Sequence, residues 1–375
     1  MPTVRIVIVG GGLSGLYAAY LLESQGIVDY VLLEARAELG GRIACISALG
    51  QEAADSATHS NSLNAFDLGP TWFWPGYQPE LDQLVEGLGL EKFAQFETGD
   101  MLLERSPNGP VKRVPGYTTS PASTRLIGGM GALSVALARK VPADKVLTGQ
   151  TVQRLSKHEQ SVVIESRDEQ GAVTFFQAEH VLLALPPRLT ASTLTFEPAL
   201  PEALERQWSA TPTWMAPHAK YIAVYDTAFW REQGLSGEAR SALGPLGEIH
   251  DASMPGAKAA LFGFFGVPAR VRETVPAPVL KAHCRAQLAR LFGPQAATPV
   301  AEFIKDWAQD PLTATPADFE PALEHAQVPA ACAATGPWRG CLTGIASEWS
   351  AQFPGYLAGA VEAARQGVQA LGVTP

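Results

Sequence analysis

Residues 4–42 read VRIVIVGGGLSGLYAAYLLESQGIVDYVLLEARAELGGR. The short β-branched run at 4–9 predicts a buried parallel strand, because polar and apolar residues do not alternate in it. Apolar side chains at helical spacing then predict a helix over about 13–24, and Gly26 ends it. A second strand over 30–33 ends at Glu34. Together, strand, helix and strand have the size of one βαβ module.

Three glycines at fixed spacing, Gly10, Gly12 and Gly15, join the first strand to the helix. The first permits a tight turn, the second lets a pyrophosphate approach the backbone, and the third lets helix and strand pack closely. The helix begins with Leu13 and Ser14, and its N-terminus offers free N–H groups and the positive end of its dipole to phosphates. The motif predicts a dinucleotide site but does not separate FAD from NAD.

The segment after the second strand adds groups that suit the rest of a dinucleotide. Glu34 stands about 20 residues beyond the glycines, where a carboxylate accepts hydrogen bonds from ribose hydroxyls. Ala35 and Arg36 follow it, and a second glycine pair leads through Gly41 to Arg42. Arginines bind pyrophosphate through charge-assisted, often bidentate hydrogen bonds. The alternatives are a glycine-rich turn with a surface glutamate, and two arginines that are solvated on the surface.

The composition excludes several other classes of protein. A formal charge of −9 leaves no basic footprint for a nucleic acid. Hydrophobic residues make up 46% of the 375 residues, which suits a large core and about two domains. The chain has no run of 18 apolar residues, so no membrane helix, signal peptide or C-terminal membrane anchor is expected. Four cysteines and seven histidines without metal-ligand spacing predict free thiols in a reducing, cytoplasmic compartment and no metal site.

Beyond residue 42, the hydrophobic pattern predicts only the approximate positions of helices, strands and one loop. Small polar residues over 47–65 predict a surface loop. Periodicity predicts helices near 79–88, 130–141, 277–292 and 355–371, and strands near 145–154, 160–166, 172–177, 181–185, 219–226 and 259–266.

With these segments in place, the sequence resembles the flavin-containing amine oxidases, which include monoamine, polyamine and L-amino-acid oxidases. The resemblance covers most of the chain in order. Besides residues 4–42, it is carried by FDLGPTW at 66–72, GGMGAL at 128–133, LPP at 185–187, KYIAVYDTAFWR at 220–231 and FPGYLAGAV at 353–361. It implies an α/β fold with a discontinuous, Rossmann-like FAD-binding domain at 1–75, 125–195 and 335–375. An α+β substrate-binding domain with a mixed sheet would take 76–124 and 196–334.

The resemblance also implies roles for residues outside the glycine motif. Lys220 would hold a water near flavin N5, where a cation helps to reduce oxygen; the alternative is a lysine that snorkels out from its strand. Trp307 would line the site beside the flavin, and Tyr356 would flank the amine with an aromatic face. For both aromatic residues the alternative is ordinary core packing. The other cofactor contacts that the resemblance implies are Gly69, Pro70, Thr71, Trp72, Val152, Glu348 and Leu357.

Departures from the family pattern have consequences of their own. Residues 311–318 hold no cysteine where some relatives attach the flavin covalently, so FAD is expected to bind non-covalently. A second aromatic residue beside the amine is missing from the same stretch. Only 52 residues separate Pro75 from Gly128, where typical relatives carry a longer helical part of the substrate domain. We therefore expect an open or reshaped substrate entrance, covered by loops, by a second copy of the chain or by another protein.

The function that the resemblance implies is FAD-dependent oxidation of a small-molecule amine, whether a primary amine, a polyamine or an amino acid. A hydride equivalent would move to flavin N5, an imine would form, and oxygen would reoxidise the flavin to give hydrogen peroxide. Arg125, Arg188 and Arg231 are candidates for binding a substrate carboxylate. Two alternatives stay open: a flavin dehydrogenase or desaturase with another electron acceptor, and a flavoprotein that serves as a redox partner or binding module.

Overall fold

The computed structural model describes residues 1–48, 65–320 and 327–372. Its chain forms two compact units. Unit 1 consists of Met1–Ile43, Leu133–Met215 and Pro311–Pro375, and unit 2 consists of Ala44–Ala132 and Ala216–Asp310. Residues 44–75, which the sequence-based division gave to the FAD-binding domain, thus fall in unit 2. The assignment of a cofactor function and a substrate function to the ranges predicted above stays a prediction.

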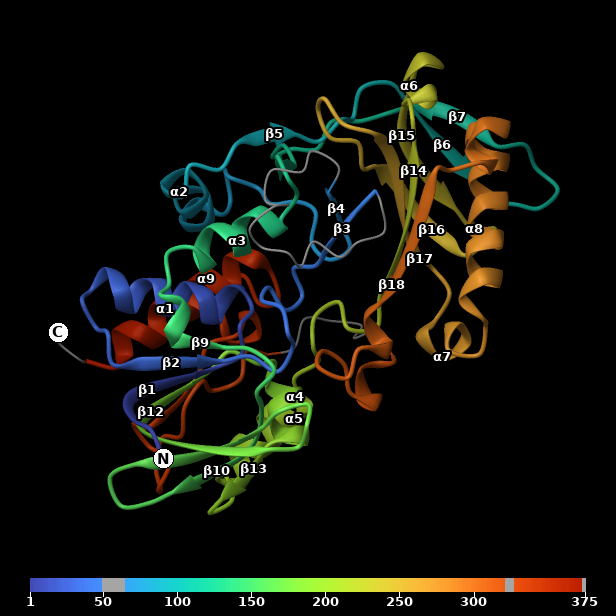
Figure 1. The fold of residues 1–375 in the computed structure, drawn as a ribbon. Helices are drawn as coiled ribbons and strands as arrows, with labels where there is room; N and C mark the ends of the chain where they lie inside the picture. Colours follow the sequence, from blue (N-terminus) through green and yellow to red (C-terminus); the bar gives the residue numbers. More distant parts are fainter. Residues whose placement is uncertain (49–64, 321–326, 373–375) are drawn as a thin grey trace. The chain divides into compact units, whose positions relative to one another are not determined.

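Unit 1 is built around an eight-stranded sheet (Figure 1). The strand order is β13-β10-β11-β12-β1-β2-β9, and β19 also pairs with β12. These strands are β1 (Thr3–Val9), β2 (Tyr30–Leu33), β9 (Val146–Leu147), β10 (Thr151–Lys157), β11 (Val162–Arg167), β12 (Val173–Leu183), β13 (Thr195–Glu197) and β19 (Leu342–Gly344). Because β1 pairs in parallel with both β2 and β12, the predicted βαβ module is present.

Three of the predicted strands differ from those observed. The strands expected near 172–177 and 181–185 are one continuous strand, β12, which pairs antiparallel with β11 in its first half and parallel with β1 and β19 in its second. The strand expected over 145–154 is divided into β9 and β10. Gly149 lies between them with φ +67°, a conformation that turns the chain and that glycine adopts readily.

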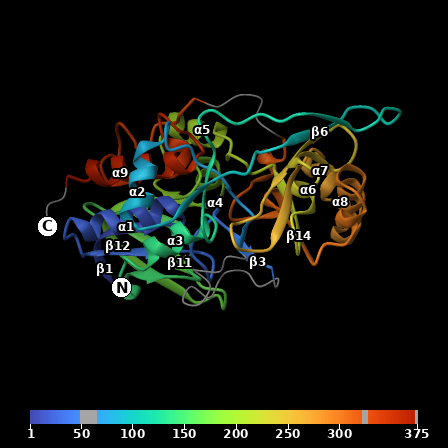
Figure 2. The ribbon, with the colours of Figure 1, turned by 90° about the horizontal axis from the view of Figure 1, so that it is seen from above.

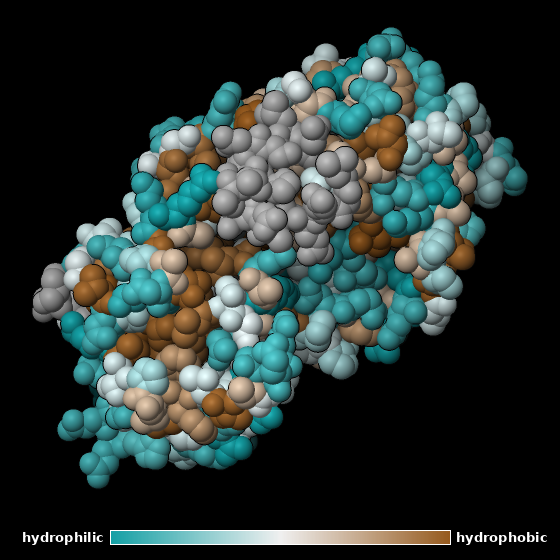
Figure 3. Space-filling model, in the orientation of Figure 1, coloured by the Kyte–Doolittle hydropathy of each residue, from teal (hydrophilic) through white to brown (hydrophobic). Residues whose placement is uncertain are grey.

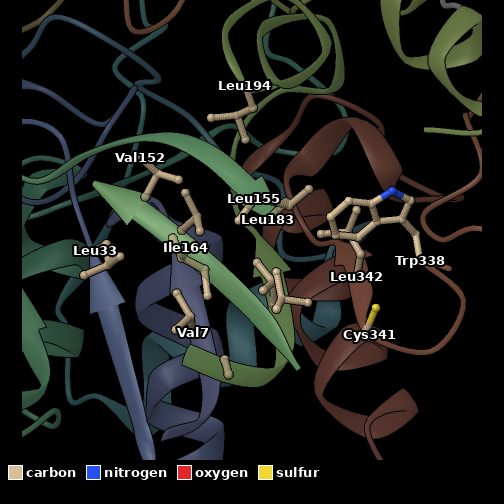
Figure 4. Close-up of a cluster of buried hydrophobic side chains, with 14 of the residues drawn as sticks. Val7, Leu33, Val152, Leu155, Ile164, Leu183, Leu194, Trp338, Cys341 and Leu342 are labelled. Carbon is tan, nitrogen blue, oxygen red and sulfur yellow. The ribbon is translucent and has the colours of Figure 1, made fainter. Parts of the chain in front are cut away.

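Helices cover the sheet of unit 1 and close its core. Its helices are α1 (Leu13–Ser24), α4 (Pro187–Thr193), α5 (Glu202–Ala210) and α9 (Leu357–Ala370), while α3 (Gly131–Ala138) spans a boundary between the units. Figures 1 and 2 show α1 and α9 side by side along β1 and β12. Buried apolar side chains from six strands, including Val7, Leu33, Ile164, Leu183 and Leu342, gather with Trp338 in one cluster (Figure 4).

Unit 2 is built around a seven-stranded sheet of order β18-β14-β17-β16-β15-β6-β7. These strands are β6 (Asp100–Glu104), β7 (Lys112–Pro115), β14 (Ala219–Tyr225), β15 (Leu235–Ser241), β16 (Leu246–Asp251), β17 (Ala259–Phe265) and β18 (Ala301–Asp306). Four further strands form two small sheets: β3 (Cys45–Ser47) with β4 (Ala65–Asp67), and β5 (Lys92–Ala94) with β8 (Thr124–Leu126). The helices are α2 (Pro79–Gly87), α6 (Phe229–Glu232), α7 (Ala269–Arg272) and α8 (Ala277–Phe292).

Two apolar clusters enclose the central strands of this sheet. Leu288 and Phe292 of α8 pack with Tyr221 of β14 in one of them. Phe66 of β4 packs with Ile222 and Phe262 in the other. Since Tyr221 and Ile222 are successive residues of β14, their side chains point to opposite faces, and the sheet is covered on both. Lys220, the residue before Tyr221, therefore points to the face that β4 covers.

Within the described ranges, no helix has both the length and the apolar character needed to cross a membrane. On the face drawn in Figure 3, polar side chains cover most of the surface, and apolar ones gather in limited areas.

The surface loop predicted over 47–65 falls mostly on residues outside the described ranges. β3 ends at Ser47 before them and β4 begins at Ala65 after them.

Candidate functional site

The predicted site residues fall into two groups, one in each unit. Unit 1 holds Gly10, Gly12, Leu13, Ser14, Gly15, Glu34, Ala35, Arg36, Gly41, Arg42, Val152, Glu348, Tyr356 and Leu357. Unit 2 holds Gly69, Pro70, Thr71, Trp72, Lys220 and Trp307.

The glycine-rich turn between β1 and α1 has the geometry that its spacing predicts. Gly10 adopts φ +107°, and a Cβ on Gly15 would lie 1.9 Å from the carbonyl oxygen of Gly10, so both positions require glycine. At Gly12 the nearest atom to an added Cβ is 3.8 Å away. Gly12 is the N-cap of α1, and no side chain caps this helix. The first N–H groups of α1, beginning with Leu13 and Ser14, are thus suited to an anionic ligand.

Glu34 lies at the end of β2 and faces the glycine turn. The residue is only 6% exposed, and its carboxylate accepts hydrogen bonds from Gly11 N at 2.6 Å and Arg36 N at 2.8 Å. The carbonyl oxygens of Glu34 and Arg36 accept from Gln150 N and Gly149 N, both at 2.8 Å. These bonds fix the segment just before Val152 beside Glu34 and Ala35. Strand β10, which carries Val152, therefore begins next to the predicted ribose site.

The second glycine pair lies against the first turn. Gly40 N donates to Gly11 O at 2.9 Å, and a Cβ on Gly41 would lie 3.2 Å from Gly12 Cα. This close approach brings Arg42 to the same part of unit 1.

Arg42 and Glu348, 306 residues apart in the chain, form a bidentate ion pair. Arg42 Nη1 lies 2.5 Å from Glu348 Oε1, and Nη2 lies 3.0 Å from Oε2. Burial alone would raise the pKa of Glu348, but the charge of Arg42 and its hydrogen bonds hold that pKa below the ordinary value of 4.5. The side chain of Glu348 is 3% exposed and that of Arg42 is 27% exposed. The sequence placed both residues at the cofactor without pairing them.

Replacing Glu348 by glutamine is expected to destabilise the protein by about 3 kcal/mol, because a partly buried guanidinium loses its counter-ion. The matched control is Glu197→Gln, which breaks the exposed pair with Arg154 and should cost about 0–1 kcal/mol. Denaturant unfolding near pH 7 measures both. The pKa of Glu348 is lowered in the folded state, so the pair stabilises above that group's ordinary pKa and stops doing so as pH falls through the folded value. A variant as stable as the control at neutral pH would contradict the prediction.

Tyr356 is the N-cap of α9, which begins at Leu357. The sequence predicted this helix near 355–371, so its observed start lies two residues later. The ring of Tyr356 packs against Trp214, with 5.7 Å between ring centroids and 34° between ring planes. Trp214 stands out in no sequence motif, and only its distance of six residues before Lys220 could have drawn attention to it.

Lys220 lies on β14 in unit 2 and is 2% exposed, so it does not snorkel out from its strand. Its Nζ donates to Asp67 O at 3.0 Å, Gly69 O at 2.6 Å and Thr71 Oγ1 at 2.7 Å. It also lies 4.5 Å from the centroid of the Phe262 ring, a cation–π distance. An ammonium group has three N–H bonds, and these three acceptors use all of them. Lys220 therefore fixes residues 67–71, the segment that the resemblance places beside the flavin.

Lys220 and Asp67 are two buried ionisable groups of unit 2, and each affects the pKa of the other. Burial lowers the pKa of Lys220 to about 7, although the nearby Asp67 opposes this shift. Burial raises the pKa of Asp67, and the charges of Arg125 and Lys220 oppose that shift. Asp67 Oδ1 accepts from Met130 N at 2.7 Å and from Cys45 Sγ at 3.2 Å. The site thus joins segments that lie far apart in the chain.

The two predicted tryptophans of unit 2 make polar as well as apolar contacts. Trp307 is 6% exposed, and its Nε1 donates to Leu68 O at 3.2 Å, next to the segment that Lys220 holds. Trp72 Nε1 donates to Gln95 at 2.8 Å, and its ring meets His250 edge-on at 4.9 Å. Gly69 and Pro70, between these contacts, are half-buried.

Within the described residues, no group of three or more metal-ligating side chains comes together. The donor set of unit 1 instead fits a dinucleotide. It combines an uncapped helix N-terminus, a glycine turn with space at Gly12, and a buried carboxylate at the end of the second strand. The fold and this site define a dinucleotide-binding protein with a Rossmann-like cofactor unit.

Comparison with known proteins gives the family. A model described as flavin containing amine oxidoreductase matches residues 116–371, and one described as an NAD(P)-binding Rossmann-like domain matches residues 8–88. The chain belongs to the flavin containing amine oxidoreductase family, whose cofactor is a flavin. The predicted family, its Rossmann-like α/β fold class and its flavin cofactor are thereby confirmed.

Individual relatives agree with this assignment. The probable flavin-containing monoamine oxidase A of Dictyostelium discoideum is 28% identical over 249 residues, covering 64% of this chain and 51% of its own. Putrescine oxidase of Kocuria rosea is 27% identical over 208 residues, covering 50% and 41%. The chain spans about half the length of the curated relatives it matches.

Solved structures show the same fold. A redesigned putrescine oxidase superposes with a TM-score of 0.78 at 20% identity, covering 99% of this chain and all of the other. Cyclohexylamine oxidase from Brevibacterium oxydans gives a TM-score of 0.78 at 21% identity, covering 99% of both chains.

Proposed function

We propose that this chain binds FAD non-covalently and catalyses the oxidation of a small amine. One observation carries the proposal: unit 1 holds the glycine turn, the buried Glu34 and the aromatic N-cap Tyr356 of α9 together, in a chain of the amine oxidoreductase family. The first N–H groups of α1 would bind the pyrophosphate and Glu34 the ribose. The backbone of Val152 would contact the adenine. Arg42, paired with Glu348, would border the cofactor.

Bound there, FAD supplies an acceptor for a hydride equivalent from the carbon next to the amine nitrogen, and then the electrons that convert oxygen to hydrogen peroxide. Tyr356 would orient the amine and exclude water with its ring. Lys220 would place a positive charge where oxygen acquires negative charge, and Trp307 would form an apolar wall. No side-chain base is needed if the amine reacts in its uncharged form.

The contacts of the three candidate arginines favour amines over amino acids as substrates. Arg188 pairs with Asp318 at 2.6 Å, and Arg231 pairs with Asp251 at 2.8 Å. Arg125 is 2% exposed and donates to the carbonyl oxygens of two residues, at 2.9 and 3.0 Å. Because each guanidinium is already engaged, none of the three is available in this arrangement for a substrate carboxylate. This supports simple amines or polyamines as the substrate class.

An anaerobic flavin-reduction screen tests the proposal. The purified, FAD-loaded protein is mixed with a panel of primary amines, polyamines and L-amino acids, and the loss of the visible absorbance of the oxidised flavin is followed. We expect amines to bleach the flavin and amino acids to leave it oxidised. Failure of every amine to do so would refute the proposal and leave the redox-partner alternative.

Further parts of the proposal concern the acceptor, the location and the oligomer. Comparing the rate of oxygen uptake with the rate of reduction of an artificial dye separates an oxidase from a dehydrogenase.

A cytoplasmic location is supported by four free cysteines, of which Cys332 is exposed. A second copy of the chain or another protein over the substrate entrance is supported by the short segment between Pro75 and Gly128.

A further inference from the structure

The ion pair of Arg42 with Glu348 binds both polar groups of the Trp214 backbone, the N–H and the carbonyl oxygen. Its N–H donates to Glu348 Oε1 at 3.2 Å, and its carbonyl oxygen accepts from Arg42 Nη1 at 3.4 Å. Met215 follows with φ +64°, in the left-handed region that a non-glycine residue seldom adopts. The contacts of Trp214 with Arg42 and Glu348 thus hold the chain immediately before a strained residue. Strain of this kind persists only where the surrounding structure imposes it.

The indole of Trp214 is packed onto the turn before α9. Gly355 adopts φ +84°, and a Cβ added to it would lie 2.4 Å from Trp214 Cβ and 2.5 Å from Trp214 Cγ. The ring of Tyr356, the next residue, lies 5.7 Å from the Trp214 ring, centroid to centroid. The close approach at Gly355 therefore brings the indole against one face of Tyr356.

The distance between these rings excludes a ligand between them. A carbon or nitrogen atom needs about 3.5–4 Å to each ring, so a ligand held between two rings needs about 7 Å from ring to ring. The observed 5.7 Å with a tilt of 34° is contact between the rings themselves. Trp214 is consequently in contact with Tyr356, and no ligand can lie between the two rings.

We propose that Trp214 is a positioning residue that holds the ring of Tyr356 at a fixed angle toward the amine. The proposal rests on the function proposed above, in which Tyr356 contacts the amine. An aromatic face attracts an amine nitrogen, and its strength depends on the ring lying at a fixed angle. Trp214 acts through Tyr356 and makes no contact with the substrate.

The first test needs no ligand. The FAD-loaded protein is labelled with 3-fluorotyrosine, and the fluorine resonance of Tyr356 is identified by its loss in Tyr356→Phe. In Trp214→Leu this resonance is expected to move by more than its linewidth, because the indole ring current is gone. Trp214→Phe, which keeps a ring, should move it less. An unchanged resonance in Trp214→Leu would overturn the proposal.

The second test measures amine binding without turnover. The probe is 2-phenylpropan-2-amine, which has no hydrogen on the carbon that bears nitrogen, and its Kd follows from the perturbed flavin spectrum. Trp214→Leu and Tyr356→Leu should each weaken binding about five- to tenfold. The double variant should bind no more weakly than Tyr356→Leu alone. FAD content should stay at the wild-type level, because the bonds of Trp214 to Arg42 and Glu348 come from its backbone.

If the two effects multiply in the double variant, Trp214 contacts the amine itself and the proposal is wrong. A wild-type protein that does not bind the probe would overturn the role toward amines, while the fluorine resonance still decides whether Trp214 holds the ring. Neither result depends on whether an amine reduces the flavin, so failure of the proposed function is detected separately, in the anaerobic screen.

Alanine substitutions at Gly355 and Gly336 separate the effect of the indole contact from the effect of backbone strain, with Gly336 as the matched control. Gly355→Ala should reproduce the weakened probe binding of Trp214→Leu, because its methyl group displaces the indole. Gly336 has a nearly equal φ of +81° but no atom within 4 Å of an added Cβ. Gly336→Ala should therefore bind the probe as the wild type does. If both alanine variants lost the same affinity for the probe, backbone strain alone would explain the effect, and the assigned role of Trp214 would be wrong.

Discussion

Replacing Lys220 by methionine is expected to slow the oxygen-dependent half of the reaction about 100-fold, because a positive charge no longer stabilises reduced oxygen. Methionine has a similar length and keeps the apolar contact with Phe262. Stopped-flow mixing of the amine-reduced protein with oxygen measures the rate. Reduction by the amine under anaerobic conditions, together with the FAD content, shows whether the variant has kept its cofactor site.

The pH profile gives the same prediction a second, independent measurement. Burial lowers the pKa of Lys220 from 10.5 to about 7, so its charge is present below that pH and absent above it. The oxygen reaction of the wild type should therefore slow as pH rises through about 7. The methionine variant has no group that titrates at this position, and its rate should not change over the same range.

Lys305 provides the matched control. It lies directly across from Lys220 in the pairing of β14 with β18, but its side chain is 30% exposed and paired with Asp310 at 2.8 Å. Lys305→Met should leave the oxygen reaction unchanged. Equal rates in the wild type and Lys220→Met, with a full complement of FAD, would show that the charge of Lys220 plays no part in it.

Gly15→Ala is expected to abolish the cofactor unit. The new methyl carbon would lie 1.9 Å from Gly10 O, a backbone atom that cannot rotate away, so α1 and the turn cannot both keep their positions. We expect a loss of about 4 kcal/mol or more and protein that is purified without FAD. Denaturant unfolding and flavin absorbance measure the two effects.

Gly12→Ala separates folding from cofactor binding. An added Cβ at Gly12 has no atom closer than 3.8 Å, so the apoprotein should unfold much as the wild type does. The methyl group would stand where a pyrophosphate approaches the backbone, and FAD should bind at least about tenfold more weakly, a difference of about 1.4 kcal/mol. If Gly15→Ala unfolded like Gly12→Ala, the close packing of α1 on the turn would not be required.

The first module of the fold could be predicted closely because its signals are local. The helix over 13–24 and the strand over 30–33 follow from apolar spacing and from glycines at their ends. Strand β12 was predicted as two strands because its first half pairs with β11, which directly precedes it, and its second half with β1 and β19, which come from distant parts of the chain. Hydrophobic periodicity reports burial but does not identify a pairing partner.

In the candidate site, too, local relationships could be predicted from the sequence and long-range contacts could not. Glu34 could be predicted from its distance to the glycines, since one module fixes both. The pairing of Arg42 with Glu348 joins residues 306 positions apart, and neither shows in its own sequence which partner it will find. Trp214 could not be predicted as a site residue, because a tryptophan outside any motif has the same sequence pattern whether it supports a site or fills a core.

The pairing of β1 with strands from the middle and the end of unit 1 has a consequence for how the protein is made. About 340 residues separate β1 from β19, and ribosomes add about 5–20 residues per second, so roughly 20 to 70 seconds pass between their synthesis. During that time β1 and α1 have emerged without β19 or α9, and for about the first half of it without β12 as well, so their apolar faces are open to aggregation or to chaperones. The part of the molecule that the sequence specifies most clearly is therefore among the last to fold.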